Sequence, residues 1–502
     1  MNSHRLFLAA ALTWTLPLIA LRADQPPASP DGVEVQARGP VHEAFAQPVN
    51  RQPEPGPVVP KQPPDPIEEV PPDEKPEGDN VQWIPGYWAW DDEQTNFLWV
   101  SGFWRVPPPA RTWVSGHWQE VDTGWQWTNG FWASADTTEL HYLPPPPPPA
   151  DQGPSTEAPD ANSIYVPGCW VYSETRYLWR PGYWIAYRPH WVWCPAYYIW
   201  TPSGCLFVEG FWDHPFDERG LLFAPVRFTA DWGRRQFVPS LVVNTDFLLG
   251  ALFVRNSYHQ YFFGDYFEAN YSQRGFVSWT DYRWAKVGVD PNFAYYRQLH
   301  RGDERWEASL KDLYRARQAG EVPRPPRTFR QQVEVVNQIN SKQTANAAVN
   351  ANIQLTHAQN VTALTPLNQV HNKNVTNLGG LGGKPPPADT GRQLKLQKIQ
   401  GEEHARELKA AEQIRNTANQ RRELEGKMLH EGQGPVKHTD APRPQKFETP
   451  KPLPHATPPA PPVKQVPAMP MVPKHEEKTI PQFEPPKSPG PPKKKPAKEG
   501  AK

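Results

Sequence analysis

The chain has 502 residues, of which 64 are proline, 22 are tryptophan and 3 are cysteine. Lysine plus arginine equals aspartate plus glutamate at 53 each, which argues against a strongly basic nucleic-acid-binding protein and against an acidic solvating one. Proline at more than twice its usual share of about 5% excludes continuous helix or sheet over much of the chain. After Trp14 every tryptophan falls between Trp83 and Trp306, so this half must supply the core.

The N-terminus is typical of a secretory signal peptide over residues 1–23. Met1–Arg5 carries positive charge, and the apolar run Leu6–Leu21 is short for a membrane span at 16 residues. We expect cleavage after Ala23, with an uncleaved anchor as the alternative. No later apolar run reaches spanning length. The sequence therefore predicts an exported protein of the periplasm, the cell envelope or the medium, with no membrane span in the mature chain.

Residues 24–80 are rich in proline and predict an extended, disordered linker. Beyond it, a W-x-x-G-x-W motif recurs in eight copies, one of which, Trp193–Tyr198, has Ala196 in place of glycine. Copies start 14 residues apart within two blocks, apart from a first interval of 16. The motif positions that we expect to be structural are Trp83, Gly86, Trp88, Trp99, Gly102, Trp104, Trp113, Gly116, Trp118, Trp127, Gly130, Trp132, Tyr165, Gly168, Trp170, Trp179, Gly182, Trp184, Phe207, Gly210 and Trp212.

Two backbone models account for the motif glycine. In the favoured model, a pair such as Pro85-Gly86 is the centre of a type II turn, so each motif is one tight hairpin in a meander. Polar segments such as Asp91–Asn96 then supply the opposite turns. This model makes aromatic residues face each other within a motif, as in Trp83/Trp88, Trp99/Trp104, Trp113/Trp118, Trp127/Trp132 and Trp179/Trp184, and Trp191/Trp200 further out. In the alternative, glycine marks a sharp bend within one longer strand.

The motifs, with an aromatic residue two positions earlier in four copies (Phe97, Trp125, Tyr177 and Trp191), resemble the YXWGXW, or WXXGXW, repeat proteins exported by bacteria. Three further stretches are similar to the larger, planctomycete-type members: Gly210–Val226, Leu248–Val254 and Phe263–Tyr266. The resemblance implies a β-rich fold and an envelope location, and it transfers no catalytic residue.

Composition divides the rest of the chain. Repeat block 1 at 81–142 is followed by a proline-rich linker at 143–163, then by repeat block 2 with an aromatic β extension at 164–289. The fold class is therefore mainly β, an antiparallel meander of short aromatic-rich hairpins with long disordered proline-rich segments.

A few helices are expected after residue 290. Residues 290–322 place Trp306, Leu310, Leu313 and Tyr314 on one apolar stripe that should dock on the β domain. A polar Asn/Gln-rich region of low order at 323–391 precedes a charged helix at 392–430. Residues 431–502 predict a disordered tail rich in proline and lysine.

No familiar catalytic or cofactor-binding motif is present, and the acidic pairs Asp217-Glu218 and Asp303-Glu304 are adjacent rather than opposed. Three cysteines without a CxxC suggest neither a disulfide framework nor a zinc site. We therefore expect no enzyme, no cofactor, no metal and no nucleic-acid partner.

The predicted function is an exported, non-enzymatic structural or interaction protein of the cell envelope, with flexible tethers and an unknown envelope protein or polysaccharide as its partner. The alternative is a glycan- or peptidoglycan-binding module that uses exposed aromatic faces, with Tyr172 and Tyr187 as candidate contacts. An unrecognised hydrolase in residues 227–320 is the remote alternative.

Overall fold

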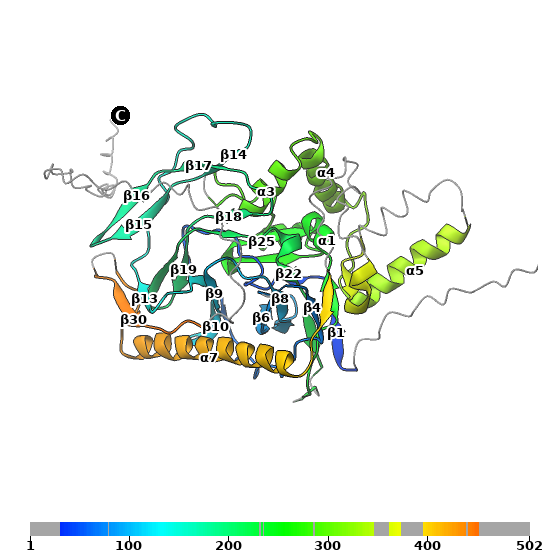
Figure 1. Cartoon of the computed structure of the whole chain (residues 1–502), viewed down its shortest axis with the longest axis horizontal. Helices are drawn as coiled ribbons and strands as arrows, with labels where there is room; N and C mark the ends of the chain where they lie inside the picture. The colour runs from blue at the N-terminus through cyan, green and yellow to red at the C-terminus, as the bar shows by residue number, and fades with distance from the viewer. Residues whose placement is uncertain are drawn as a thin grey trace, which may run out of the picture. The chain divides into compact units, whose positions relative to one another are not determined.

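Short antiparallel strands dominate the computed structural model, and most helical residues lie in the C-terminal half of the chain (Figure 1). The structure describes residues 31–78, 80–229, 232–233, 235–284, 287–345, 361–372, 395–437 and 440–450. The predicted signal peptide and the predicted tail beyond residue 450 lie outside these residues. The mainly β class, built from antiparallel aromatic-rich hairpins, is confirmed.

The repeat strands pair as four long hairpins, each built from two successive motifs. In hairpin 1, an inner pair next to the turn joins β6 (Tyr87–Asp91) to β7 (Asn96–Val100), and an outer pair joins β5 (Gln82–Ile84) to β8 (Phe103–Arg105). The strands of hairpin 2 are β9 (Arg111–Val114), β10 (His117–Val121), β11 (Gly124–Thr128) and β12 (Phe131–Ser134). Those of hairpin 3 are β14 (Ser163–Val166), β15 (Cys169–Ser173), β16 (Arg176–Arg180) and β17 (Tyr183–Ala186). Those of hairpin 4 are β18 (Val192–Cys194), β19 (Tyr197–Thr201), β20 (Gly204–Val208) and β21 (Phe211–Asp213).

Each motif aromatic faces a partner in the other motif of its hairpin. Trp88 faces Trp99, and Trp83 faces Trp104. The other facing pairs are Trp118–Trp127, Trp113–Trp132, Trp170–Trp179, Tyr165–Trp184, Tyr198–Phe207 and Trp193–Trp212. Ring centroids in these pairs lie 5.1–5.5 Å apart. The tight-hairpin prediction is therefore wrong for Trp83/Trp88, Trp99/Trp104, Trp113/Trp118, Trp127/Trp132, Trp179/Trp184 and Trp191/Trp200.

The chain reverses at the polar segments between motifs and bends at the motif glycines. Hairpin 2 closes with two residues between Val121 and Gly124, and hairpins 3 and 4 close in the same way. A type II turn at Pro-Gly twists against the strand twist, whereas a short polar connection accommodates it. The bent-strand alternative thus describes the motif glycine.

Each motif glycine leaves room for an aromatic ring of the paired motif. A Cβ on Gly116 would lie 2.5 Å from Cζ2 of Trp127, and one on Gly130 would lie 2.5 Å from Cζ2 of Trp113. The same covering relation holds for Trp99 over Gly86, Trp83 over Gly102, Trp179 over Gly168, Tyr165 over Gly182 and Trp193 over Gly210. The first aromatic of a motif and the glycine of its partner are therefore one packing unit, which explains their fixed spacing.

Residues 31–78 correct the predicted disordered linker over 24–80. Four short strands of this segment pair with strands from elsewhere: β1 (Val33–Val35) with β23 (Val226–Phe228), β2 (Gly39–Pro40) with β26 (Gln260–Phe263), β3 (Val58–Val59) with β11, and β4 (Glu74–Pro76) with β29 (Leu396–Lys398). Val41 and Phe45 are buried in the main core. Proline interrupts long elements here, but the apolar side chains still bury between the hairpins.

The region after the repeats packs on them with a small sheet and helices. β25 (Leu252–Arg255) pairs with β26 on one side and with β27 (Phe276–Ser278) on the other. Four helices follow the repeats up to residue 319: α1 (Thr245–Gly250), α2 (Ala269–Gln273), α3 (Pro291–Leu299) and α4 (Trp306–Ala319). Trp306, Leu310 and Tyr314 of α4 are buried, and the Tyr314 hydroxyl accepts a hydrogen bond from the backbone N–H of Leu252.

The C-terminal part is more ordered than composition predicts. Within 323–391, expected to be of low order, the structure has α5 (Phe329–Ala345), β28 (Leu364–Pro366) paired with β24 (Leu241–Val243), and η3 (Leu367–Asn372). The charged helix α7 (Glu402–His430) begins ten residues later than predicted. In the predicted tail, β30 (Arg443–Lys446) pairs with β13 (Glu139–Tyr142). Segments of polar composition here gain order because they add strands to existing edges.

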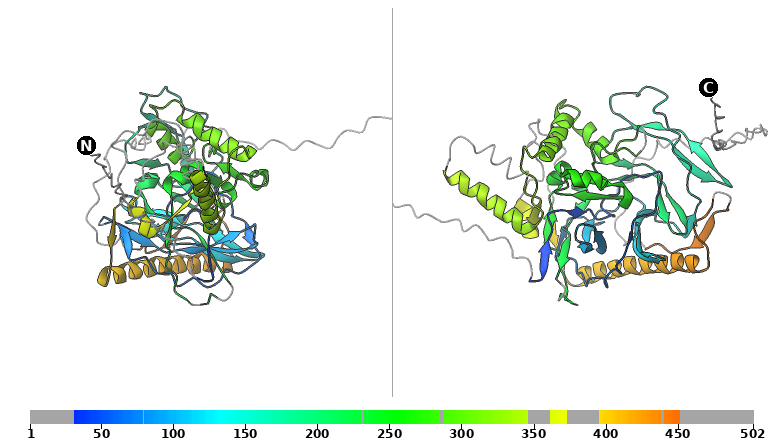
Figure 2. Two further views of the ribbon diagram at one scale, coloured as in Figure 1. Left: turned by 90° about the vertical axis from the view of Figure 1, so that its right-hand side faces the viewer. Right: turned by 180° about the vertical axis from the view of Figure 1, so that it is seen from behind.

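Helix α7 lies along hairpins 1 and 2, where it contacts β5, β9 and β10 (Figures 1 and 2). Its charged residues Glu407, Arg421 and Glu425 are buried. Arg421 pairs with Glu425 at 2.8 Å, and Glu425 also accepts a hydrogen bond from the Tyr142 hydroxyl. Charge on this helix therefore serves docking as well as solvation.

Candidate functional site

A carboxylate from the proline-rich N-terminal segment enters the bend of hairpin 1. Glu69 accepts hydrogen bonds from the backbone N–H groups of Gly86 and Gly102, each at 2.8 Å. It also accepts one from Nε1 of Trp99 at 3.0 Å. The bend exposes backbone donors that the strand pairs leave unused, and a buried carboxylate satisfies them.

Hairpins 2 and 3 receive carboxylates in the same way. In hairpin 2, Glu43 accepts from the backbone N–H of Gly130 at 3.0 Å and from Nε1 of Trp127 at 2.7 Å. In hairpin 3, Asp151 accepts from the backbone N–H of Gly168 and from the Tyr165 hydroxyl. Asp151 belongs to the proline-rich linker predicted for 143–163, which is thus packed along hairpin 3.

Burial dominates the protonation of the two glutamates. It raises the pKa of Glu43 to about 7, although Gly130, Trp127 and Asn129 donate hydrogen bonds that oppose the rise. Burial also raises the pKa of Glu69, against the donors of its own bend. Both glutamates are therefore structural acids whose charge depends on pH.

Sequence reasoning missed these three acids because it assigned them to linkers. A signal was present: Glu69 precedes Gly86 by 17 residues, and Asp151 precedes Gly168 by 17 residues. Each of these glycines is the first motif glycine of its block. An acid at a fixed distance before each block therefore marks the proline-rich segment that enters the first bend of that block. We call a segment of this kind, with its carboxylate in a hairpin bend, a strap.

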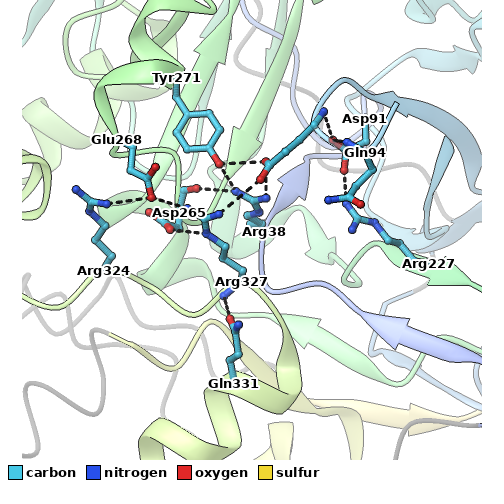
Figure 3. Close-up of polar contacts among 11 residues, drawn as sticks. Arg38, Asp91, Gln94, Arg227, Asp265, Glu268, Tyr271, Arg324, Arg327 and Gln331 are labelled. Carbon is cyan, nitrogen blue, oxygen red and sulfur yellow. Dashed lines mark hydrogen bonds and ion pairs between the residues drawn. The ribbon is translucent and has the colours of Figure 1, made fainter. Parts of the chain in front are cut away.

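The acidic tip of hairpin 1 docks on a network of arginines (Figure 3). Arg38 donates to Glu93 at 2.6 Å and to the Tyr271 hydroxyl at 2.7 Å. Arg327 pairs with Asp265 at 2.8 Å and lies 3.6 Å from Glu93. Further ion pairs of this region join Arg227 to Asp91, Arg255 to Asp92, and both Arg324 and Arg327 to Glu268. Since its charges are paired, this network fixes the tip of hairpin 1 rather than offering a free charged site.

The carboxylates of the acidic pair Asp217-Glu218 do not converge on a common point. Burial raises the pKa of Asp217 to about 6, and this carboxylate accepts a hydrogen bond from the Tyr296 hydroxyl at 3.3 Å. Its neighbour Glu218 instead contacts His190. Over the described residues, no group of three or more His, Cys, Asp or Glu side chains is arranged to hold a metal ion. The cysteines Cys169, Cys194 and Cys205 are unpaired.

An aromatic pocket lies among hairpin 3, hairpin 4 and α3. Its lining residues are Ile164, Tyr165, Val166, Ile185, Ala186, Tyr187, Arg188, Trp191, Trp193, Pro195, Trp212, Trp284, Val289, Pro291, Ala294 and Tyr295. Arg188 is the charged member of this lining, and its guanidinium lies 5.3 Å from the ring centroid of Trp212. The pocket can therefore offer aromatic surface to a ligand.

The candidate contacts Tyr172 and Tyr187 lie on hairpin 3 in different surroundings. Tyr172 faces Tyr177 near the turn, with ring centroids 5.1 Å apart, and packs on a small cluster around Tyr198. Tyr187 follows β17, packs on Tyr295 and lines the aromatic pocket. Both rings are half-buried. The structure therefore places only Tyr187 at the pocket.

The fold and its bends define a repeat protein built from double-motif aromatic hairpins. A family model of the WXXGXW repeat matches the chain in two copies, at residues 78–105 and 164–184, which correspond to hairpins 1 and 3. The chain therefore contains the WXXGXW repeat. No curated protein and no solved structure matches it. No helix within the described residues has the length and apolar character needed to cross a membrane.

Proposed function

We propose that the protein is an exported, non-enzymatic structural or interaction protein of the cell envelope. This role is supported by the observation that the motif residues pack against one another inside the protein. Trp83, Trp99 and Trp104 are fully buried, and each hairpin bend of block 1 is closed by a carboxylate. A module built this way is rigid, and it presents other surfaces to partners.

Export rests on the signal-peptide pattern of residues 1–23, and an envelope location on the resemblance to exported repeat proteins. Similarity of Gly210–Val226 and Leu248–Val254 to the planctomycete-type members extends this proposal to the larger envelope proteins of that kind.

Cell fractionation of a tagged full-length chain tests the proposal. We expect the wild type in envelope or periplasmic fractions and a matched variant without residues 2–23 in the cytoplasm. Envelope material captured with the wild-type chain is then analysed for both protein and glycan. Recovery of the intact wild-type chain from the cytoplasm would contradict export.

Glycan binding is the second candidate function, and half-buried rings on hairpin 3 favour it. Trp179 and Trp184 expose part of their rings, unlike their counterparts Trp99 and Trp104 in hairpin 1. Partly exposed aromatic faces stack on sugar rings. We expect Tyr187→Ala to stay folded yet lose retention on peptidoglycan or polysaccharide, whereas Tyr172→Ala, which removes a half-buried ring outside the pocket, should keep it. Absence of wild-type retention on any envelope polysaccharide at physiological salt would exclude this candidate.

A further inference from the structure

The third strand of each repeat hairpin has an outer edge, and in hairpins 1, 2 and 4 another segment of the chain pairs with that edge. β23 pairs with β7 at Trp99, and β3 pairs with β11 at Trp125. In hairpin 4, Leu143 exchanges two backbone hydrogen bonds of 2.8 Å with Cys205 of β20. All three contacts are antiparallel. Three of the four hairpins are therefore extended at the same strand.

The equivalent strand of hairpin 3 has no such extension. Strand β16 pairs with β15 and with no other strand among the described residues. By its place in the hairpin, Tyr177 of β16 corresponds to Trp125 and Cys205, and Trp179 corresponds to Trp99. The positions that bind an added segment in the other hairpins are thus present in β16.

The backbone groups of β16 that could bind a further strand point outward. Along a strand paired antiparallel on one side, alternate residues direct their N–H and C=O groups away from the partner. Trp170, which faces Trp179 across the pair, shows this direction because its carbonyl accepts from the Tyr198 hydroxyl of β19 at 2.8 Å. Figure 1 shows β15 between β19 and β16, so the outer side of β16 faces away from hairpin 4. On that side, no backbone hydrogen bond joins Tyr177 or Trp179 to another described residue.

The segments that occupy the other three edges share a branched aliphatic residue next to proline. These pairs are Pro225-Val226, Val59-Pro60 and Leu143-Pro144. In the last two, proline follows the paired residue, so the N–H that it lacks would point away from the hairpin and no ladder hydrogen bond is lost. An aliphatic residue followed by proline therefore forms a short added strand.

Charge distinguishes the edge of hairpin 3 from its occupied counterparts. β16 contains Arg176 and Arg180, whereas β7, β11 and β20 contain no charged residue. Arg176 is exposed and makes no ion pair with the described residues. In hairpin 1, the added strand β23 brings Arg227 to Asp91 near the tip, so an added strand can complement the charge of its hairpin. A segment that complements β16 carries a carboxylate.

The same charge disfavours two other occupants of this edge. Two copies of β16, paired antiparallel through Tyr177 and Trp179, would place Arg176 opposite Arg180. Residues 451–502 contain aliphatic residues beside proline, but their ten lysines against four glutamates make this segment basic. Charge complementarity therefore favours a segment of a different protein.

We propose that the outer edge of β16 binds an extended segment of another protein, in which an aliphatic residue is followed by proline and then by acidic residues. The aliphatic residue pairs antiparallel with Tyr177, as Val59 pairs with Trp125, and a carboxylate lies near Arg176. This inference rests on the interaction role proposed above and names the chemistry of the partner.

A peptide based on β3 is the appropriate probe. PGPVVPEE copies residues 55–62 with Lys61→Glu and Gln62→Glu, and PGPVVPKK is its matched basic form. The edge of β11 already holds this segment in cis, where its effective concentration is high, so added peptide finds β16 open. Calorimetric titration of the full chain should show one saturable site for the acidic peptide and at least about tenfold weaker binding of the basic peptide. The difference should shrink in about 1 M salt.

N-methylation of the acidic peptide separates strand pairing from charge attraction. A methyl group on the nitrogen at the Val59 position removes the N–H that points to β16, and it should weaken binding at least about tenfold. The same group at the Val58 position lies on the other side of the peptide and should leave the affinity unchanged. On the protein, amide hydrogen exchange resolved to single residues should show new protection of Tyr177, and none of Leu178, whose N–H faces β15.

A charge reversal on the protein locates the site. Arg176→Glu changes an exposed side chain and should reverse the preference, so that the basic peptide binds more tightly than the acidic one. Arg330→Glu, at an exposed position of α5, is the matched control and should keep the wild-type preference. Melting temperatures establish that both variants are folded.

The proposal would be overturned by no saturable binding of the acidic peptide at about millimolar concentration, by equal affinity for the two N-methyl peptides, or by an unchanged charge preference in Arg176→Glu. Binding by a chain ending at Pro450 but not by the full chain would reassign the edge to residues 451–502. Self-association of the full chain that the peptide reverses would reassign it to a second copy. Both reassignments also overturn the proposal. None of these results affects the fractionation experiment, so the envelope role is judged separately.

Discussion

Hairpins 1 and 3 are built from the same motif and the same contacts, yet they lie in different environments. In both, inner and outer aromatic pairs face each other, rings cover the opposite glycines, and an acid 17 residues upstream enters the first bend. Trp83, Trp99 and Trp104 of hairpin 1 are 0% exposed, whereas their equivalents in hairpin 3, Tyr165, Trp179 and Trp184, are half-buried. Trp88 and its equivalent Trp170 are half-buried in both hairpins. The motif therefore specifies the hairpin, and its neighbours decide how deeply it is buried.

The neighbours differ in kind. Hairpin 1 is extended on its outer pair by β22 (Gly220–Leu221), on its inner pair by β23, and is covered by α7. The strand pairs of hairpin 3 remain two-stranded. An isolated two-stranded ribbon is marginally stable in water. We therefore infer that the stability of hairpin 3 depends on its strap, whereas the stability of hairpin 1 depends on its packing in the core.

The comparison predicts that tryptophan-to-alanine substitutions at equivalent positions of the two hairpins lower the free energy of unfolding by different amounts. Trp99→Ala removes a fully buried ring and one donor to Glu69, so it should lower the free energy of unfolding by about 3–5 kcal/mol. Trp179→Ala removes a half-buried ring and should cost about half as much. Urea denaturation of both full-length variants measures the difference, and equal losses would show that burial by neighbours does not set the energy.

A second prediction uses the acid of hairpin 2. Burial raises the pKa of Glu43 to about 7 in the folded chain, above its ordinary value of 4.5. Between these values the folded state holds more protons than the unfolded state, so this group's contribution to stability is complete below pH 4.5 and is lost as pH rises through 7. The loss should be at most about 3 kcal/mol.

Glu43→Gln isolates this contribution, because the amide does not titrate. The free energy of unfolding of the wild type, measured by urea at several pH values, should fall relative to that of the variant between pH 4.5 and pH 7 and run parallel to it above pH 8. Parallel curves over the whole range would mean that folding does not shift the pKa of Glu43.

Sequence reasoning reached the fold class and the repeat but not the pairing of strands. Trp88 can face either Trp83 across the motif or Trp99 across the following polar segment, and a 14-residue period satisfies both. Only the twist of the turn distinguishes these two strand pairings.

The acids Glu43, Glu69 and Asp151 were missed for another reason. Proline excludes regular secondary structure, but a proline-rich segment can still be buried. The contact between a strap and a distant hairpin leaves no signal in the local sequence other than the repeated spacing between the acid and the motif glycine.

The degenerate copy in hairpin 4 tests the packing unit of ring and glycine. Here Ala196 replaces glycine, and the ring at the covering position is Phe207 instead of tryptophan. Phe207→Trp should overpack the bend and cost about 1–3 kcal/mol. Ala196→Gly should restore most of this loss in the double variant, since the larger ring then meets no Cβ. Additive effects in this double-mutant cycle would show that the two positions are not coupled.

The smallest expected effect concerns the strap of hairpin 3. Asp151→Asn keeps the shape of the side chain but replaces an ionised acceptor for the Gly168 N–H and the Tyr165 hydroxyl. Because hairpin 3 has no further strand on either pair, the loss should be local, about 1 kcal/mol in the opening of this hairpin. Amide hydrogen exchange resolves it: protection should fall in β14–β17 and stay unchanged in β5–β8, which have their own acid. If protection fell equally in hairpin 1, the two hairpins would unfold as one cooperative unit, and the half-buried hairpin would owe its stability to the core rather than to its strap.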